Sequence, residues 1–217
     1  MVLAVASVET ARRGLMAPGS IQARYREAQL SPRDHTTAGP TAGNTGCEQP
    51  LLLAWRALPH TPTGDRLALL LSRFGDHARG WVGLGIAAAV CDRARASRWL
   101  GAALTAVATE QASRQIKGLI RRPRPQLDGL PPLAGVTSRY SFPSSHTATA
   151  LAAIYTFDGL LPRPVLVGWA LLTAASRPYL GVHYPSDVLG GALLGYATGK
   201  AARAVTSRAS GWAAGGG

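Results

Sequence analysis

Residues 143–161 read PSSHTATALAAIYTFDGLL, a short polar cluster followed by an apolar, alanine-rich run. Ser144 and Ser145 are of the type that caps helix N-termini, and the run after them has the composition of a buried helix. The unpaired N–H groups in the first turn of a helix attract anions. The stretch therefore predicts an apolar helix that begins at an anion-binding site, with His146 at its mouth. Capping serines are also common where no ligand binds, so this prediction depends on residues elsewhere in the chain.

Five apolar stretches of this kind occur in the chain: Trp81–Val90, Trp99–Ala108 with its continuation to Ile116, Thr147–Leu161, Val165–Ala175 and Val188–Val205. Each is near the lower end of the ~17–25 residues that a transmembrane helix needs, or requires its flanks to reach it. Small residues, which let membrane helices pack closely, are frequent, and Gly191, Gly195 and Gly199 repeat at four-residue spacing. Strand-like alternation is nearly absent. We therefore predict an all-α, membrane-embedded bundle of about five transmembrane helices, with a soluble helical bundle as the alternative.

Two further features favour a membrane location. The segment 49–73 is amphipathic and too short to span a bilayer, so it predicts N-terminal interfacial helices; packed helices of a soluble domain are the alternative. Trp81, Trp99 and Trp169, with arginines nearby, are predicted to anchor the bundle at the membrane interface. These features predict a multi-pass protein of the cell membrane. The cues for which side the site faces conflict, because basic residues lie on both sides of the predicted bundle.

The chain divides into three parts by composition. Residues 1–48 are polar and rich in Pro, Gly and Thr, and they predict a disordered, basic N-terminal tail. Residues 49–205 form the predicted membrane-embedded domain, and residues 206–217 a flexible C-terminal tail. A wrongly chosen start codon would also explain the first segment, so the sequence leaves open whether it belongs to the mature protein.

The charge balance indicates anionic partners. The chain has 23 Lys and Arg against 11 Asp and Glu, a formal net charge of +12. No segment interleaves basic and aromatic residues as a base-stacking surface would, which argues against nucleic acid and favours anionic lipid. Cys47 and Cys91 lie far apart, and no Cys/His spacing typical of zinc occurs, so neither a disulfide framework nor a metal site is predicted. The oligomeric state does not follow from the sequence.

A basic cluster follows the second apolar stretch and consists of Lys117, Arg121, Arg122 and Arg124. Four cations so close together repel one another unless an anion lies between them. A phosphate meets this need, because guanidinium groups match its oxygens. The alternative is a surface patch for anionic lipid headgroups.

A third polar cluster is Ser176-Arg177, followed by His183 and Asp187. Pro185 suits the first turn of a helix, which places Asp187 in that turn, near the positive end of the helix dipole. From there its carboxylate can reach one ring nitrogen of His183, which leaves the other nitrogen free to attack. A His–Asp pair at this spacing has a purely structural role about as often.

Antiparallel helices would bring these clusters together. The second and fourth apolar helices would run toward one end of the bundle, and the third and fifth would start from it. Lys117, His146, Arg177 and His183 would then all lie at the same end. If each cluster had a separate, purely structural role, there would be no reason for all of them to lie at the same end of the bundle.

The three clusters together resemble the motifs of the type 2 phosphatidic acid phosphatase superfamily. In this sequence the motifs are Lys117-(six residues)-Arg124-Pro125, Pro143-Ser144-Ser145-His146 and Ser176-Arg177-(five residues)-His183-(three residues)-Asp187. They span residues 117–187, and the likeness in helix layout extends over about 50–205. All three motifs at these spacings form a specific signal, which any single one would not.

The resemblance implies catalytic roles for His183, His146 and Asp187, and phosphate binding by Lys117, Arg124, Ser144, Ser145 and Arg177. His183 looks like the nucleophile that forms a phosphohistidine, Asp187 like its orienting partner, and His146 like the general acid. The family commonly has glycine at the position of Ser145, a departure that donation from the backbone would survive. The family needs no metal or other cofactor, since the cations can stabilise the transferring group.

The implied activity is hydrolysis of the phosphomonoester of a polyprenyl-linked or glycerolipid substrate. Phe74-Gly75-Asp76-His77 and the small size look like actinobacterial phosphatases of decaprenylphosphoryl-5-phosphoribose, a precursor lipid of cell-wall arabinan. Phosphatidic acid, phosphatidylglycerol phosphate and undecaprenyl pyrophosphate are competing substrates. The sequence also leaves open a soluble enzyme of the same chemistry, such as an acid phosphatase or a vanadate-dependent haloperoxidase, and a non-enzymatic binder of anionic lipid.

Overall fold

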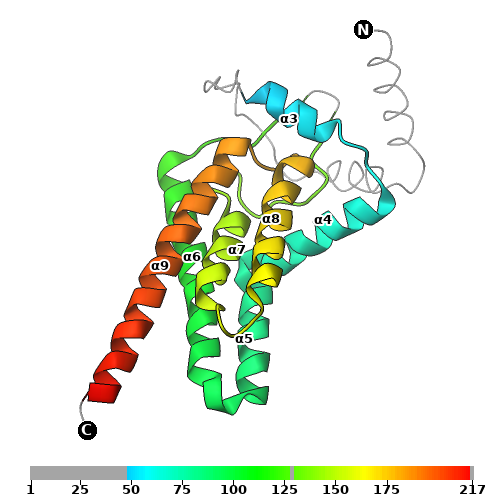
Figure 1. Cartoon of the computed structure of the whole chain (residues 1–217). Coiled ribbons are helices and arrows are strands. Elements are labelled where there is room, and N and C mark those ends of the chain that lie inside the picture. The colour runs from blue at the N-terminus through cyan, green and yellow to red at the C-terminus, as the bar shows by residue number, and fades with distance from the viewer. Residues whose placement is uncertain (1–47, 128–129, 216–217) are drawn as a thin grey trace.

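The computed structural model of the protein describes residues 48–127 and 130–215, which form helices and connecting loops (Figure 1). The α-helices are α3 (Gln49–Arg56), α4 (Pro62–Gly75), α5 (Arg79–Cys91), α6 (Ala96–Ile120), α7 (Ser145–Thr156), α8 (Arg163–Tyr179) and α9 (Pro185–Gly215). Two short 3₁₀ helices, η1 (Asp76–Ala78) and η2 (Arg93–Arg95), flank α5. The described residues contain isolated β-bridges but no strand, which confirms the all-α class.

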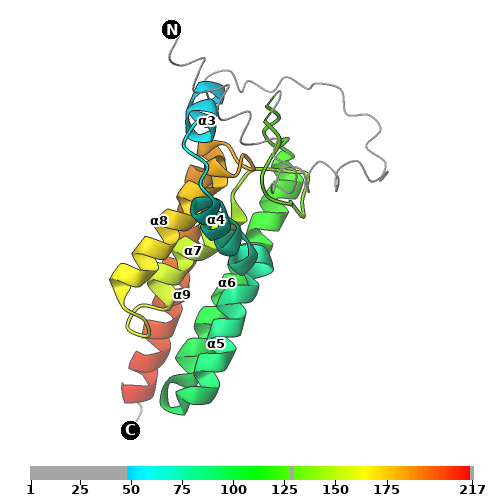
Figure 2. The ribbon, with the colours of Figure 1, turned by 90° about the vertical axis from the view of Figure 1, so that its right-hand side faces the viewer.

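Helix α7 lies at the centre of the bundle. It packs against α6, α8 and α9, and α5 and α6 form an antiparallel hairpin beside it (Figures 1 and 2). Helix α4 runs obliquely along one end of the bundle, and α3 contacts α8 at that end. The chain reverses between successive helices, so α6 and α8 end where α7 and α9 begin. This is the antiparallel arrangement predicted from the sequence.

All five predicted apolar stretches are helical and correspond to α5–α9. The third ends earlier than predicted, since α7 stops at Thr156 and Gly159 turns the chain with a φ of +73°. Glycine reaches this left-handed conformation without steric cost. The amphipathic segment 49–73 forms the two helices α3 and α4, and Thr61 caps the second by accepting a hydrogen bond from the N–H of Gly64.

Glycines allow α7 and α9 to approach closely. A Cβ atom at Gly191 would overlap the carbonyl oxygen of Ser144, directly before α7. A Cβ atom at Gly195, one turn further along α9, would overlap the carbonyl oxygen of Ala148. The four-residue repeat of small residues is therefore the face of α9 that contacts α7, as such repeats are in closely packed helix pairs.

Replacing Gly195 by alanine is expected to lower the free energy of unfolding by about 1–3 kcal/mol, because the added methyl group overpacks this contact. Gly101 in α6 provides the matched control, since a Cβ atom there meets nothing within 4 Å. Gly101→Ala is expected to stabilise the protein by up to about 1 kcal/mol or to leave it unchanged. Thermal unfolding of both variants in detergent measures the difference. Equal stability of the two variants would contradict the close approach of α7 and α9.

Two tryptophans predicted as membrane anchors lie in the core instead. Trp81 and Trp99 are 3% and 5% exposed, and both rings pack near Phe157. The indole N–H of Trp99 donates to Oδ2 of Asp92 at 3.0 Å, so its polar atom is satisfied within the fold. Trp169 is partly buried against the same cluster. The anchor assignment was wrong because these rings pack against residues from other parts of the chain, such as Phe157, which a local pattern does not reveal.

The membrane spans predicted from the sequence are not confirmed by the helices themselves. Within the described part of the chain, no helix combines the length and the hydropathy that a membrane crossing requires. The transmembrane spans and the interfacial position of α3 and α4 therefore stay predictions.

The predicted tails are only partly covered by the structure. Residues 1–47 lie outside the described residues. Glu48 is described, and its carboxylate accepts hydrogen bonds from Arg122 and Ser186, so this residue is held by the helical domain. Residues 206–215 continue α9, and the flexibility of the C-terminal tail stays a prediction.

Candidate active site

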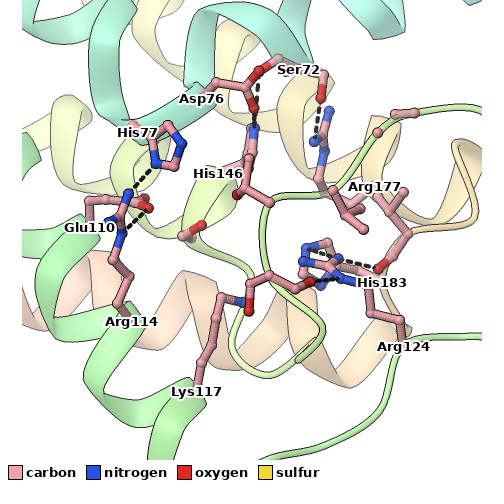
Figure 3. Close-up of a pocket in the computed structure, with 17 residues that line it drawn as sticks. Ser72, Asp76, His77, Glu110, Arg114, Lys117, Arg124, His146, Arg177 and His183 are labelled. Carbon is pink, nitrogen blue, oxygen red and sulfur yellow. Dashed lines mark hydrogen bonds and ion pairs between the residues drawn. The ribbon is translucent and has the colours of Figure 1, made fainter. Parts of the chain in front are cut away.

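Six of the predicted site residues line one cavity, at the end of the bundle where α7 and α9 begin (Figure 3). They come from separate helices and loops: Lys117, Arg124, Ser145, His146, Arg177 and His183. The cavity has a volume of about 200 Å³, and a water molecule in the liquid takes ~30 Å³. It therefore has room for a phosphate group and for part of the group that carries it.

His183 is 3% exposed and lies between Arg124 and Asp187. Its Nε2 atom is 3.3 Å from Nη1 of Arg124, and its Nδ1 atom is 3.4 Å from Oδ2 of Asp187. Because a guanidinium group can only donate, the first contact favours the tautomer with the lone pair on Nε2 and the hydrogen on Nδ1. The second is a charge contact rather than an aligned hydrogen bond, since Nδ1 has no hydrogen-bond partner among the described residues.

The surroundings of His183 keep its ring neutral. Burial lowers its pKa well below the usual 6.5, and the positive charges of Arg124, Lys117 and Arg177 lower it further. A neutral imidazole has a lone pair available for attack on phosphorus. Burial also lowers the pKa of Arg124 to about 10, so this residue is still a cation at neutral pH.

Asp187 is fully buried in the first turn of α9. Its Oδ2 atom accepts a hydrogen bond from the backbone N–H of Tyr184 at 2.8 Å, which caps the helix. Its Oδ1 atom accepts from Nη1 of Arg122 at 2.8 Å and from Oγ of Ser141 at 3.4 Å. The sequence predicted the position of Asp187 beside His183, but not these three partners.

Arg122 was grouped with the phosphate-binding cations in the sequence analysis, but it does not line the cavity. Besides Asp187, its guanidinium group donates to Oγ of Ser186 at 2.5 Å and to Oε1 of Glu48 at 3.2 Å. Arg121 is exposed and donates to a carbonyl of its own helix. The predicted sharing of one anion by four cations is therefore wrong for these two arginines. Carboxylates distant in sequence supply the counter-charge of Arg122, and solvent reaches Arg121.

Lys117 and Arg124 hold the loop before α7 in addition to lining the cavity. The ammonium group of Lys117 donates to backbone carbonyls of that loop, including that of Ser141 at 3.0 Å. Arg124 donates through Nε to the carbonyl of Ser138 and through Nη1 to that of Val182, both at 2.7 Å. An ammonium group has three donors and a guanidinium group five, so both residues keep donors for a ligand.

Helix α4 and η1 contribute two residues that the sequence analysis did not assign. Ser72 accepts a hydrogen bond from Nη1 of Arg177 at 3.2 Å, and its carbonyl oxygen is 3.0 Å from Nε2 of His146. Oδ1 of Asp76 is 3.2 Å from the same nitrogen. Burial alone would raise the pKa of Asp76, but the hydrogen bond from His146 and the charge of Arg177 outweigh it and lower that pKa. The sequence signals for Asp76 were its position directly before an apolar helix and its place in the stretch Phe74-Gly75-Asp76-His77.

The two serines at the start of α7, Ser144 and Ser145, make different contacts. Ser144 accepts hydrogen bonds from the backbone N–H and the hydroxyl of Thr147, which confirms it as the cap of α7. Ser144 does not line the cavity, whereas Ser145 does. Contact of Ser144 with a phosphate therefore stays a prediction.

Comparison with known proteins agrees with this geometry. The sequence profile of the PAP2 superfamily matches residues 98–210, more than half of the chain. The chain belongs to the PAP2 superfamily. It is accordingly a lipid phosphatase and a phosphoric monoester hydrolase, as the sequence predicted, and the non-enzymatic alternative is set aside.

Several relatives carry names that describe an activity. The decaprenylphosphoryl-5-phosphoribose phosphatase of Mycolicibacterium smegmatis is 38% identical over 135 residues, which cover 61% of this chain and 72% of that protein. The protein of the same name in Mycobacterium tuberculosis is 36% identical over 129 residues, 59% of this chain and 73% of that protein. The lipid A 1-phosphatase of Rhizobium johnstonii is 33% identical over 107 residues, 45% of this chain and 44% of that protein. The predicted likeness to the first kind is confirmed as a similarity.

Two crystal structures share the fold. The transmembrane PAP2 type phosphatidylglycerolphosphate phosphatase of Bacillus subtilis superposes with a TM-score of 0.64 at 22% identity, covering 77% of this chain and 89% of that one. LpxE of Aquifex aeolicus superposes with a TM-score of 0.57 at 24% identity, covering 72% of this chain and 94% of that one. At these identities the likeness establishes the helical fold alone.

The fold brings the PAP2 motifs together at one cavity, as the antiparallel arrangement predicted. Asp187 lies next to His183 but is not one of the residues that line the cavity. The sequence analysis assigned no role to Ser72 and Asp76 and the wrong one to Arg122, because none of the three is one of the residues that define the motifs. The roles of the individual motif residues stay predictions.

Proposed function

We propose that this PAP2 protein hydrolyses the phosphomonoester of a polyprenyl-linked sugar lipid, decaprenylphosphoryl-5-phosphoribose, in the synthesis of a cell-wall precursor. The observation that carries the proposal is the cavity in which His183 lies together with Lys117, Arg124 and Arg177. The choice of lipid is supported by the similarity to proteins named for that activity. Phosphatidylglycerol phosphate, phosphatidic acid and undecaprenyl pyrophosphate are the competing substrates.

The proposed reaction passes through a phosphohistidine in two steps. First, the lone pair on Nε2 of His183 attacks phosphorus, the P–O bond to the lipid alkoxide breaks, and His146 gives that oxygen a proton. Then His146 takes a proton from a water molecule, the water oxygen attacks phosphorus, and the P–N bond breaks to release phosphate. Asp187 would stabilise the positive charge of the phosphorylated ring from 3.4 Å. Asp76, 3.2 Å from Nε2 of His146, would do the same for the protonated acid.

The cations would supply the electrostatic part of catalysis. Phosphoryl transfer spreads charge over the non-bridging oxygens, so fixed donors around them lower the barrier. Arg124 and Arg177 are held by bonds to the backbone and to Ser72, respectively, and need little rearrangement when a phosphate binds. Enclosure in a largely buried cavity strengthens their effect, because water does not screen it.

The distribution of side chains supports a multi-pass location in the cell membrane. Large aliphatic residues lie exposed on the outer faces of four helices: Ile86, Val90, Leu100, Leu104, Val107, Val165, Leu171, Leu172, Leu189 and Leu193. Threonines such as Thr109, Thr149 and Thr173 lie buried in the interior. An apolar exterior around a small and partly polar interior suits a lipid environment. The structurally similar Bacillus subtilis phosphatase is described as transmembrane.

A panel of purified lipid phosphates tests the proposal. Phosphate release by the full-length protein in detergent is expected to show the highest kcat/KM for decaprenylphosphoryl-5-phosphoribose. A higher value for another lipid of the panel would replace that substrate, and release from none of them would overturn the proposal.

A separate experiment tests the membrane location. Retention of the protein in carbonate-washed membranes is expected, and its recovery in the soluble fraction would favour the soluble alternative.

Replacing His146 by alanine is expected to slow hydrolysis of an alkyl phosphate about 10²–10⁴-fold, since the leaving alkoxide then receives no proton from the enzyme. Hydrolysis of p-nitrophenyl phosphate should lose much less, because nitrophenolate leaves without protonation. The ratio of the two rates in the variant and in the wild type measures the effect. Equal losses for both substrates would contradict the role of His146 as the acid.

The acid limb of the kcat/KM profile is expected below pH 6.5, because the pKa of His183 is lowered by burial and by the charge of Arg124. Removing that charge raises the pKa, so Arg124→Gln is expected to shift the acid limb toward higher pH while also reducing the rate. Profiles measured from pH 4 to 8, a range set by the ~6.5 pKa of free histidine, would show the shift. A limb that moves to lower pH in Arg124→Gln would contradict this account.

A further inference from the structure

In addition to the phosphate-binding cations, a second set of polar residues lines the cavity: Asp76, His77, Glu110 and Arg114. Figure 3 shows Glu110, Arg114 and His77 across the cavity from His183, with His146 between them. We call Glu110, Arg114 and His77 the headgroup wall. The proposed chemistry does not use these residues, and a carboxylate is unfavourable beside a phosphate because like charges repel. The wall therefore requires a separate explanation.

Glu110 has one carboxylate oxygen without a partner. The residue is 7% exposed, and its Oε1 atom accepts a hydrogen bond from Nε of Arg114 at 3.1 Å. Its Oε2 atom is buried and has no hydrogen-bond partner among the described residues. A buried charged oxygen left in this state is unfavourable, and native proteins rarely retain one without a purpose. A ligand that donates a hydrogen bond from the cavity, with a small shift of the side chain, would satisfy it.

The chain beside Glu110 is held in an uncommon conformation. His77 and Ala78 have φ values of +54° and +58°, in the left-handed region that residues with a Cβ atom seldom occupy. In this conformation Nδ1 of His77 contacts Nη2 of Arg114. Arg114 thus joins α6 to η1, and the headgroup wall has a defined geometry before any ligand binds.

The chemistry of the wall selects a class of ligand. An ionised phosphate accepts hydrogen bonds and donates none, so it cannot supply the donor that Oε2 of Glu110 lacks. An ammonium group would, but Lys117, Arg124 and Arg177 in the same cavity repel it. A hydroxyl group is neutral, donates to a carboxylate and accepts from a guanidinium group. Neighbouring hydroxyl groups of a sugar or polyol therefore match the pair of Glu110 and Arg114.

The spacing along α6 agrees with a ligand of that size. Glu110 and Lys117 lie seven residues apart, on the same face of the helix. The helical rise separates their backbones by roughly 10 Å. A phosphate held by Lys117 is too small to reach Glu110, whereas a phosphate esterified to a pentose is long enough to do so.

We propose that Glu110 and Arg114 form a subsite for the hydroxyl groups of the sugar or polyol that carries the scissile phosphate. The subsite rests on the proposed function, which identifies the cations as the phosphate site. It makes the protein selective for phosphates of sugars and polyols over phosphate esters without hydroxyl groups, such as phosphatidic acid.

Two matched ligands test the subsite: methyl ribofuranoside 5-phosphate, and tetrahydrofurfuryl phosphate, which has the same ring and phosphate without hydroxyl groups. Binding is measured by calorimetry on full-length His183→Ala protein in detergent, which does not turn the ligands over. The riboside is expected to bind at least about tenfold more tightly, the effect of one hydrogen bond to a charged group. Equal binding of the two would overturn the proposal without any change at Glu110.

Glu110→Gln in the same background is the matched variant, because it keeps the size of the side chain and replaces the Oε2 acceptor by a donor. It is expected to weaken binding of the riboside about threefold or more, because a neutral amide binds a hydroxyl group less strongly than a carboxylate does, with binding of inorganic phosphate unchanged within about twofold. Equal weakening of all three ligands would overturn the subsite, since it would indicate damage to the phosphate site.

The outcomes for the subsite and for the proposed function can be told apart. If the wild type hydrolyses lipid phosphates but shows no preference for the riboside, the proposed subsite is contradicted and the proposed function is not. If the protein binds the riboside selectively but hydrolyses no lipid phosphate, the proposed function is contradicted and the proposed subsite is not.

Discussion

Replacing His183 by alanine is expected to reduce phosphate release from a lipid phosphate by a factor on the order of 10⁴ or more. The substitution removes the nitrogen that forms the P–N bond, and water must then attack the ester directly. Arg124, Arg177 and Lys117 remain in the cavity, so the variant is expected to bind phosphate still. Initial rates with purified protein in detergent measure the loss, and full activity of the variant would remove His183 as the nucleophile.

Trapping of the intermediate separates loss of chemistry from loss of fold. Quenching wild-type protein in alkaline detergent during turnover of a ³²P-labelled substrate is expected to yield a phosphoprotein that is labile in acid and stable in alkali, and His183→Ala is expected to yield none. His60 provides the matched control, because it lies between α3 and α4 and its Nδ1 atom is 3.0 Å from Asp65, outside the cavity. His60→Ala should retain the phosphoprotein.

Replacing Asp187 by asparagine is expected to reduce kcat about 10²–10⁴-fold and to lower the free energy of unfolding by about 3–5 kcal/mol. The carboxylate is fully buried and accepts from both Arg122 and the N–H of Tyr184. An asparagine amide has only one oxygen, so its NH₂ group must face one of these donors. The positive ring of phosphorylated His183 also loses the charge beside Nδ1.

Asp158→Asn is the matched control for this substitution. Asp158 pairs with Arg203 at 2.6 Å, but the Arg203 side chain is 55% exposed, so solvent screens the pair. A loss of less than about 1 kcal/mol is expected there, with kcat unchanged. Denaturant unfolding and kcat per folded protein measure both effects. If Asp187→Asn destabilises the protein but keeps kcat, Asp187 serves only as a helix cap and does not orient His183.

Local sequence patterns were sufficient to predict which segments are helical. Apolar runs predicted α5–α9, and serines before α7 and Pro185 in α9 marked two of the starts, because helix propensity and capping act over a few residues. The repeat of Gly191, Gly195 and Gly199 was visible as a pattern of small residues, and the structure shows that this face of α9 contacts α7. The same patterns failed for Trp81 and Trp99, since a tryptophan with arginines nearby suits a membrane interface and a core equally well. Only the packing partners distinguish the two.

The motif residues were predictable as a set because their spacing along the chain is itself specific. Their supporting residues were not, since those belong to contacts over long sequence distances. Arg122 lies 65 residues from Asp187, and Asp76 lies 70 residues from His146. Among four neighbouring cations, the sequence offered no criterion for which would bind a phosphate and which would neutralise a buried carboxylate.

Residue order and spacing thus specified the helices, their alternating direction and the convergence of three polar clusters at one end, because these depend on local propensity and on chain reversal. Three-dimensional packing assigned each charge its partner: Arg124 to the cavity, Arg122 to Asp187, and Asp76 to His146. It also left Oε2 of Glu110 without a partner among the described residues. Charge pairing depends on distances of a few ångströms between segments far apart in the chain, and those distances exist only once the helices have packed.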